Sequence, residues 1–188
     1  PYYNSADFTP IFINEVDQVE KVITHQINDF SFLNQNEQIF SLEHIKGKVH
    51  VANFMFTSCG SICPSMTRNL KLVNNQFKND KKVLFLSYTV TPWLDTPKKL
   101  KEYKKFYEIK NHNWHFLTGK KSKIYSLARK SYFAEETLGF SKDSSDFLHT
   151  EHFLLVDKTL RIRGIYNGTL QLEMDQLIKD IKTLRELY

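Results

Sequence analysis

With 188 residues, 41% of them hydrophobic and 14% aromatic, the chain can bury a core of its own, which argues against global disorder. The net charge of +5 comes from lysines scattered along the chain, without a continuous stripe beside aromatic platforms, so we expect no nucleic-acid partner. No stretch reaches the roughly 18–20 apolar residues of a membrane span.

The pattern of apolar residues changes at residue 27. Residues 1–26 have few core positions and are expected to form an N-terminal arm, while residues 27–188 form a single domain. Two short alternating segments flank a polar Asn-Gln-Asn turn in residues 27–42, which predicts a β-hairpin. Residues 49–58 are almost continuously apolar, which predicts a central strand buried on both faces.

Two helices and a second central strand are expected next. Met66, Leu70, Val73 and Phe77 recur at helical spacing after Pro64. A buried strand is predicted at 82–90. Thr96 and Pro97 then have the residue types of a helix N-cap and first turn, and the predicted helix runs through Tyr107.

The remaining elements of the fold are predicted from residue 113 onward. We expect a strand at 113–119, a helix at 122–132, and a hairpin formed by 152–157 and 160–168. A final amphipathic helix is predicted with one apolar face: Leu172, Leu177, Ile181 and Leu184. This order of elements is typical of one α/β sandwich around a mixed sheet.

Both cysteines of the chain, Cys59 and Cys63, follow the first buried strand directly. In α/β sheets, ligands collect beyond the carboxyl ends of strands, and a helix N-terminus there favours thiolate over thiol. Residues four apart on a helix differ by about 40° in azimuth, so both sulfurs can face one point. The pair can therefore form a disulfide or hold a soft metal ion. A purely structural disulfide is disfavoured, because so short a loop removes little entropy from the unfolded chain.

The segment GKVHVANFMFTSCGSICPSMT resembles the Sco/SenC family of copper-binding, thioredoxin-like proteins. The matching features are the apolar strand, Cys-x-x-x-Cys-Pro and the following Met-Thr. Further similar segments are DTPKKLKEYKKF, WHFLTG and HTEHFLLVDKTLRIRGIYNG, and the resemblance as a whole extends over roughly residues 27–188. The resemblance implies a thioredoxin-like three-layer sandwich, to which the hairpin at 27–42 is an addition.

The same resemblance implies a copper site made by Cys59, Cys63 and a distant histidine. The family's ligand stands four residues before the first large apolar strand residue, here Phe153, and this frame selects His149; His152 is the alternative. Two thiolates suit Cu(I), and an added imidazole lets the same site hold Cu(II).

The chain also departs from the family pattern near the cysteines. Gly60, Ser61 and Ile62 lie between them where many members begin with proline and an acidic residue, and Thr91-Pro92 replaces the family's Asp-Pro. Asp95 is retained. It is expected either to orient the residues that touch the metal or to serve only as an acidic group at the helix N-terminus.

The resemblance implies a copper metallochaperone that delivers copper to the binuclear copper site of cytochrome c oxidase or prepares its thiols. Its partner is then the copper-accepting subunit or another copper chaperone. One alternative is a thiol-disulfide oxidoreductase in which Cys59 attacks and Cys63 resolves. Another is a peroxiredoxin-like peroxidase, for which Thr57 and Arg68 are available.

Membership of this family further implies an extracytoplasmic, membrane-anchored protein, on the bacterial periplasmic side or in the mitochondrial intermembrane space. The membrane tether is expected to lie outside the present sequence, which opens at Pro1. We expect a monomer.

Overall fold

The computed structural model describes residues 1–134, 147–148 and 150–187. Within these residues, a central mixed sheet has seven strands. The strands are β1 (Ser31–Asn34), β2 (Ile39–Ser41), β3 (Val49–Met55), β4 (Val83–Thr89), β5 (Trp114–Thr118), β6 (His152–Val156) and β7 (Ile162–Asn167). They lie in the order β2-β1-β5-β4-β3-β6-β7. Neighbours β3, β4 and β5 are parallel, and every other pairing is antiparallel.

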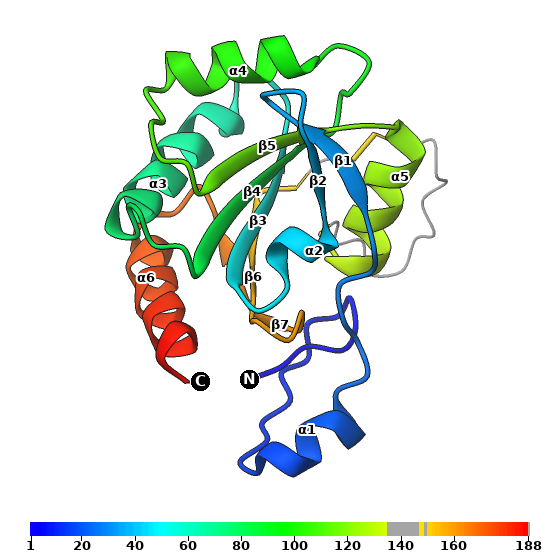
Figure 1. Cartoon of the computed structure of the whole chain (residues 1–188). Helices are drawn as coiled ribbons and strands as arrows, with labels where there is room; N and C mark the ends of the chain where they lie inside the picture. Colours follow the sequence, from blue (N-terminus) through cyan, green and yellow to red (C-terminus); the bar gives the residue numbers. More distant parts are fainter. Residues whose placement is uncertain (135–146, 149, 188) are drawn as a thin grey trace.

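Helices cover both faces of this sheet (Figure 1). They are α1 (Val16–Val22), α2 (Leu42–Ile45), α3 (Ile62–Gln76), α4 (Pro97–Phe106), α5 (Lys121–Ser126) and α6 (Gln171–Glu186), and a π-helical turn, Leu127–Ser131, continues α5. Helices α3, α4 and α6 bury their apolar residues in one core with one face of the sheet, and α2 and α5 do so on the other. The fold is the thioredoxin-like α/β sandwich that the sequence predicts.

Strand β3 shows why the centre of the sheet is so apolar in sequence. Val51 and Met55 point into the core that contains α3, whereas Ala52 and Phe54 point into the core that contains α5. All seven residues of the strand are buried. A strand with helices on both faces needs apolar side chains on both, so the alternation of an exposed strand is lost.

Most of the predicted elements are confirmed. The hairpin β1–β2 lies at the sheet edge beyond β5, and the hairpin β6–β7 lies at the opposite edge. Thr96 caps α4 by accepting a hydrogen bond at its Oγ1 from the Lys99 amide. Helix α3 begins earlier than predicted, at Ile62, and places Pro64 in its first turn, where no helical N–H bond is lost.

One predicted helical face is partly wrong. In α6, Leu177, Ile181 and Leu184 are buried, but Leu172 is 82% exposed. Met174 is buried in its place. The spacing explains the difference, because Met174 precedes Leu177 by three residues, whereas Leu172 precedes it by five and lies off that face.

The N-terminal arm contains more structure than its sequence suggests. It includes α1, and Tyr2, Val19 and Ile23 form a small buried cluster. The Tyr3 amide donates to the carbonyl of Ile162 in β7 at 3.2 Å. In Figure 1 the arm lies at the end of the sheet opposite α4.

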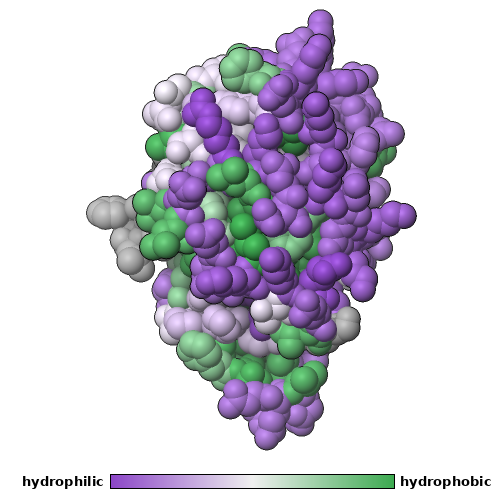
Figure 2. Space-filling model, turned by 90° about the vertical axis from the view of Figure 1, so that its left-hand side faces the viewer, coloured by the Kyte–Doolittle hydropathy of each residue, from purple (hydrophilic) through white to green (hydrophobic). Residues whose placement is uncertain are grey.

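The face that carries α3 and α6 is mainly hydrophilic, with a patch of hydrophobic residues across its middle (Figure 2). Exposed large hydrophobic residues of these helices include Leu72 and Leu172. Among the described residues, no helix combines the length and hydropathy needed to cross a membrane.

Candidate metal centre

The two cysteines lie where β3 passes into α3, at the carboxyl end of the central strand. The cysteine loop, residues 56–61, joins the two elements and contains Cys59, while Cys63 is the second residue of α3. Both side chains are thiols and both are buried. Ser61 Oγ lies 3.7 Å from Cys59 Sγ. The structure therefore brings together the two residues that the sequence predicts to act as a pair.

The environment separates the acidities of the two thiols. Burial acts to raise the pKa of Cys59, but hydrogen bonds from the Cys63 thiol and from the amides of Ser61 and Cys63 outweigh it, so this pKa is lowered. Burial, with the hydrogen bond to Cys59 as the next cause, raises the pKa of Cys63 to about 12. Cys59 is thus the thiol that ionises first, and Cys63 stabilises its thiolate by donating a proton in a hydrogen bond.

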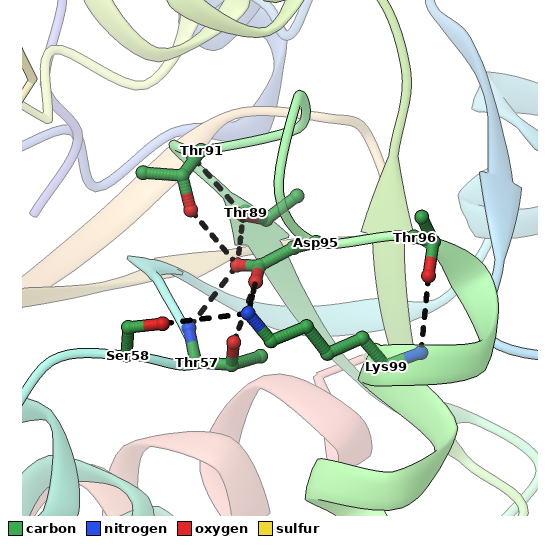
Figure 3. Close-up of polar contacts among 7 residues, drawn as sticks. All are labelled: Thr57, Ser58, Thr89, Thr91, Asp95, Thr96 and Lys99. Atoms are coloured by element: carbon green, nitrogen blue, oxygen red, sulfur yellow. Dashed lines mark hydrogen bonds and ion pairs between the residues drawn. The ribbon is translucent and has the colours of Figure 1, made fainter.

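A buried carboxylate ties the cysteine loop to the neighbouring strand (Figure 3). Asp95 has no exposed surface. Its Oδ2 accepts hydrogen bonds from the Thr57 amide at 3.1 Å, Thr89 Oγ1 at 2.6 Å and Thr91 Oγ1 at 3.0 Å. Its Oδ1 accepts from Thr57 Oγ1 at 2.5 Å. We call Asp95 and these three threonines the Asp95 cage.

Lys99 closes the cage on the side of α4. Its Nζ lies 3.7 Å from Asp95 Oδ1 and 3.4 Å from Ser58 Oγ, the residue before Cys59 (Figure 3). Asp95 is thus one residue before the N-cap of α4 and also bonds the cysteine loop directly. A buried charge needs such partners, because an unpaired carboxylate there would cost several kcal/mol.

The cage also explains how the chain accommodates threonine where the resembling family carries aspartate. Thr91 donates to Asp95, so position 91 supplies a hydrogen-bond donor to the carboxylate. A second carboxylate at that position would stand beside a buried like charge. The Thr91-Pro92 departure is therefore compatible with a fully bonded Asp95.

His149, the histidine selected in the sequence, lies outside the described residues. Its neighbours are described: Leu148 is buried in the core, and the Phe147 ring contacts Phe56 edge to face, with 5.6 Å between centroids. Phe56 is the first residue of the cysteine loop. The alternative, His152, begins β6 and has Nδ1 3.4 Å from Thr150 Oγ1.

The remaining histidines have structural surroundings of their own. His50 is completely buried and shares a hydrogen bond with the Tyr132 hydroxyl. His25 bonds the Ser131 carbonyl, and His44 bonds Ser41. Within the described ranges, no cluster of three or more histidine, cysteine or acidic side chains could hold a metal ion.

Sequence reasoning missed the threonines of the cage as a group. In the sequence, Thr57 stands out only as a residue available to a peroxidase, and Thr89 falls inside the strand predicted at 82–90. Both stand where adjacent parallel strands end, since β4 pairs Thr89 with Met55 of β3. Polar residues at the ends of two apolar strands, followed by an Asp before a helix cap, are the signal that would have found the cage.

The dithiol is the part of the site that can do chemistry. Two thiols four residues apart are donors that soft metal ions prefer, and they are also a pair that can be oxidised to a disulfide. A peroxidase would need the Arg68 guanidinium beside its reactive cysteine. This guanidinium lies 5.9 Å from the centroid of the Tyr107 ring. Two thiol side chains are a donor set that suits copper.

Comparison with known proteins identifies the relatives of this chain. The family model SCO1/SenC matches residues 19–186. A SCO1/SenC family lipoprotein from Bacillus anthracis has a similar structure, with a TM-score of 0.75 and 31% identity over 87% of this chain and 97% of that one. BsSco, described as a member of the Sco family of cytochrome c oxidase assembly proteins with a disulfide switch, gives 0.74 and 33% over 87% and 95%.

A more distant neighbour shares the fold. The structure of Bradyrhizobium japonicum ScoI with copper bound has a TM-score of 0.67 and 23% identity, covering 86% of this chain and 99% of that one. The family model spans the sheet, the cysteine loop, the Asp95 cage and the C-terminal helix. This chain belongs to the SCO1/SenC family.

Proposed function

We propose that this protein is a copper metallochaperone that binds one copper ion through Cys59, Cys63 and His149. It delivers the copper to the binuclear copper site of cytochrome c oxidase, or prepares the thiols of that site. The observation that carries the proposal is the pair of buried thiols at the carboxyl end of β3, Cys59 in the cysteine loop and Cys63 in the first turn of α3. Family membership and the copper-bound neighbour support the choice of metal.

The chemistry of the donors supports copper over harder cations. Two thiolates satisfy Cu(I), and an imidazole as third ligand extends the site to Cu(II). The contact of Phe147 with Phe56 supports the part proposed for His149, because it fixes a residue two positions before it against the cysteine loop. When bound, the metal holds both cysteines deprotonated.

Asp95 is proposed to position the cysteine loop without touching the metal. It holds the amide and hydroxyl of Thr57, two residues before Cys59, and so fixes where that sulfur can point. Mutation of groups that orient ligands in this way typically lowers metal affinity about 10–100-fold.

A thiol-disulfide oxidoreductase is the second candidate, and the unequal pKa values of the thiols favour it. Cys59 thiolate would attack a partner disulfide to form a mixed disulfide, and Cys63 would then displace the partner's sulfur. The partner gains two electrons and two protons, and this chain ends as the Cys59–Cys63 disulfide. The low pKa of Cys59 suits an attacking group.

The setting of the protein follows from the same proposal. We propose an extracytoplasmic, membrane-anchored monomer on the bacterial periplasmic side or in the mitochondrial intermembrane space. Its partner is the copper-accepting oxidase subunit or another copper chaperone. The relative from Bacillus anthracis is called a lipoprotein, which supports an anchored form.

The deciding experiment adds Cu(I) and Cu(II) separately to the reduced protein and follows stoichiometry and the thiolate-to-copper absorption. We expect one copper per chain. Cys63→Ser should abolish stable binding of either ion, and His149→Ala should weaken Cu(II) binding more than it slows reduction of a model disulfide. His152→Ala is the matched control and should bind copper like the wild type.

Three results would contradict parts of this proposal. Loss of Cu(II) binding in His152→Ala but not in His149→Ala would transfer the ligand to His152. Equal loss of copper binding and disulfide reduction in His149→Ala would give that histidine a structural role. Failure of the wild type to form a stable complex with either ion would leave the oxidoreductase as the function.

A further inference from the structure

The turn between β4 and α4 carries two exposed hydrophobic side chains beside the candidate metal centre. Trp93 is 54% exposed and Leu94 is 51% exposed. They lie between Thr91 and Asp95, which are both buried and hydrogen-bonded to each other. Tryptophan is among the residues that contribute most to binding at protein interfaces, so its exposure here needs an explanation.

This turn is firmly held in the protein. The amides of Leu94 and Asp95 both donate to the Thr91 carbonyl at 2.9 Å. On the other side, the Tyr125 hydroxyl donates to the Val90 carbonyl at 2.7 Å. A surface held this way loses little conformational entropy when a partner covers it, which favours binding.

The same turn is bonded to the cysteine loop. Asp95 follows Leu94 directly and accepts two hydrogen bonds from Thr57, two residues before Cys59 (Figure 3). A molecule that covers Trp93 therefore sits on the segment that also fixes the cysteine loop. These hydrogen bonds connect the exposed turn with the loop that carries Cys59.

Most of the charges that the described residues place around the turn are positive. Lys121 Nζ lies 5.2 Å from the Trp93 ring centroid, and Lys98 and Lys101 are exposed on α4. Residues 91–102 and 119–125 together contain six lysines and two carboxylates, those of Glu102 and of Asp95, and Asp95 is buried in its cage with Lys99 Nζ 3.7 Å away. A protein that binds here needs acidic side chains around an apolar contact, since opposite potentials steer association and like charges oppose it.

We propose that Trp93 and Leu94, with the surrounding lysines, form the docking surface for the protein that takes copper or electrons from Cys59 and Cys63, and that this protein presents an acidic face. The inference rests on the proposed function, because it assigns the surface to that function's partner. A protein is favoured over a lipid surface, since the turn is bonded to the cysteine loop and a lipid surface offers no acceptor for copper or thiol electrons.

Binding is best measured apart from chemistry. The probe is the reduced soluble domain of the cytochrome c oxidase subunit that carries the binuclear copper site, titrated against the Cys59→Ser/Cys63→Ser protein by calorimetry. Adding Trp93→Ala and Leu94→Ala should raise Kd by at least about tenfold. Adding Lys98→Glu and Lys101→Glu should slow association and reduce its dependence on ionic strength.

Matched substitutions far from the turn serve as controls. Phe12→Ala removes an aromatic side chain that is 75% exposed in the N-terminal arm. Lys179→Glu reverses an exposed lysine on α6. Both should leave Kd and the association rate as they are in the parent protein.

The outcomes separate this inference from the proposed function. An equal Kd for the parent and the Trp93 variant, or no binding of the domain at all, overturns the docking surface, while copper titration of the protein alone still reports on the metal site. Binding that depends on Trp93 without any copper transfer from the wild type overturns delivery and keeps the surface. Binding to vesicles of phosphatidylcholine and phosphatidylglycerol that depends on Trp93, without binding of the domain, overturns the inference in favour of a membrane.

Discussion

His50 shows how far a single residue in this fold can depart from its ordinary chemistry. It lies on β3, completely buried, and its Nε2 is 3.0 Å from the Tyr132 hydroxyl. Its Nδ1 has no hydrogen-bond partner among the residues that the structure describes. Burial lowers the pKa of His50 from 6.5 to about 3, because the core does not solvate an imidazolium ion.

This burial predicts that the protein loses stability as the pH falls below neutrality. Between pH 6.5 and about 3 the unfolded chain binds a proton at His50 that the folded protein refuses, so acid favours unfolding. One pKa unit corresponds to about 1.4 kcal/mol, so His50 alone should lower the free energy of unfolding by about 2 kcal/mol at pH 5 relative to pH 7. Urea unfolding of wild type and His50→Phe at several pH values measures this slope.

The quantity to compare is the slope of the free energy of unfolding against pH. Its absolute value also changes in His50→Phe, because this variant loses the hydrogen bond to Tyr132. The variant should show a shallower fall with acid, with part of the slope retained by His115, whose pKa burial lowers to about 4. His112→Phe, a substitution at an exposed histidine, should keep the wild-type slope. Parallel slopes for wild type and His50→Phe would show that His50 contributes nothing to the acid response.

At the scale of elements, the Asp95 cage joins three pieces of structure. Thr57 follows β3, Thr89 ends β4, and Asp95 precedes α4. Each of these elements is also packed in the core, but the cysteine loop itself has few apolar anchors besides Phe56. The cage therefore provides the polar contacts that fix the loop in place.

We predict that Asp95→Asn loosens the cysteine loop and destabilises the protein. The amide presents a donor where the carboxylate accepted, so at least one bond from the threonines is lost and the free energy of unfolding should fall by about 1–3 kcal/mol. Hydrogen exchange at the Thr57 amide, which donates to Asp95, should speed up. Asp175→Asn, at an exposed position on α6, is the control. Unchanged protection of Thr57 would mean that the loop is fixed by other contacts.

The contrast between the strands and this cage shows what the sequence could predict. Apolar runs and helical periodicity placed β3, α3 and the cysteines correctly, because those signals lie within a few residues of one another. The cage depends on Met55 pairing with Thr89 and on the turn that brings Asp95 back over both strands. Such pairings are tertiary, so no local pattern contains them. The pKa difference between the thiols escaped prediction for the same reason, since burial and mutual hydrogen bonding decide it.

At the scale of the whole molecule, the N-terminal arm is bound along the β7 edge of the sheet. The Arg163 guanidinium lies 3.8 Å from the Tyr2 ring centroid, and Arg161 forms an ion pair with Glu20 at 2.9 Å. The His25 imidazole bonds the Ser131 carbonyl at the end of the π-helical turn. Tyr3 and Phe8 of the arm also pack against the core that contains α5, while the buried cluster of the arm consists of its own residues.

The contacts of the arm predict that residues 27–188 fold without it. The buried residues of the two large cores all lie from Ile27 onward, and only the partly buried Tyr3 and Phe8 of the arm pack against one of them, whereas the buried cluster of Tyr2, Val19 and Ile23 is separate. Removing residues 1–26 should therefore leave one cooperative unfolding transition, with a free energy of unfolding lower by about 2 kcal/mol, on the order of one buried side chain. Thermal unfolding followed by near-ultraviolet circular dichroism measures it. Tyr2→Ala in the whole chain, which removes the Arg163 contact and one side chain of the arm's buried cluster, should fall between the two. A shortened chain without a cooperative transition would show instead that the arm and the sandwich are one folding unit, since cooperative unfolding requires that the remaining core be stable alone.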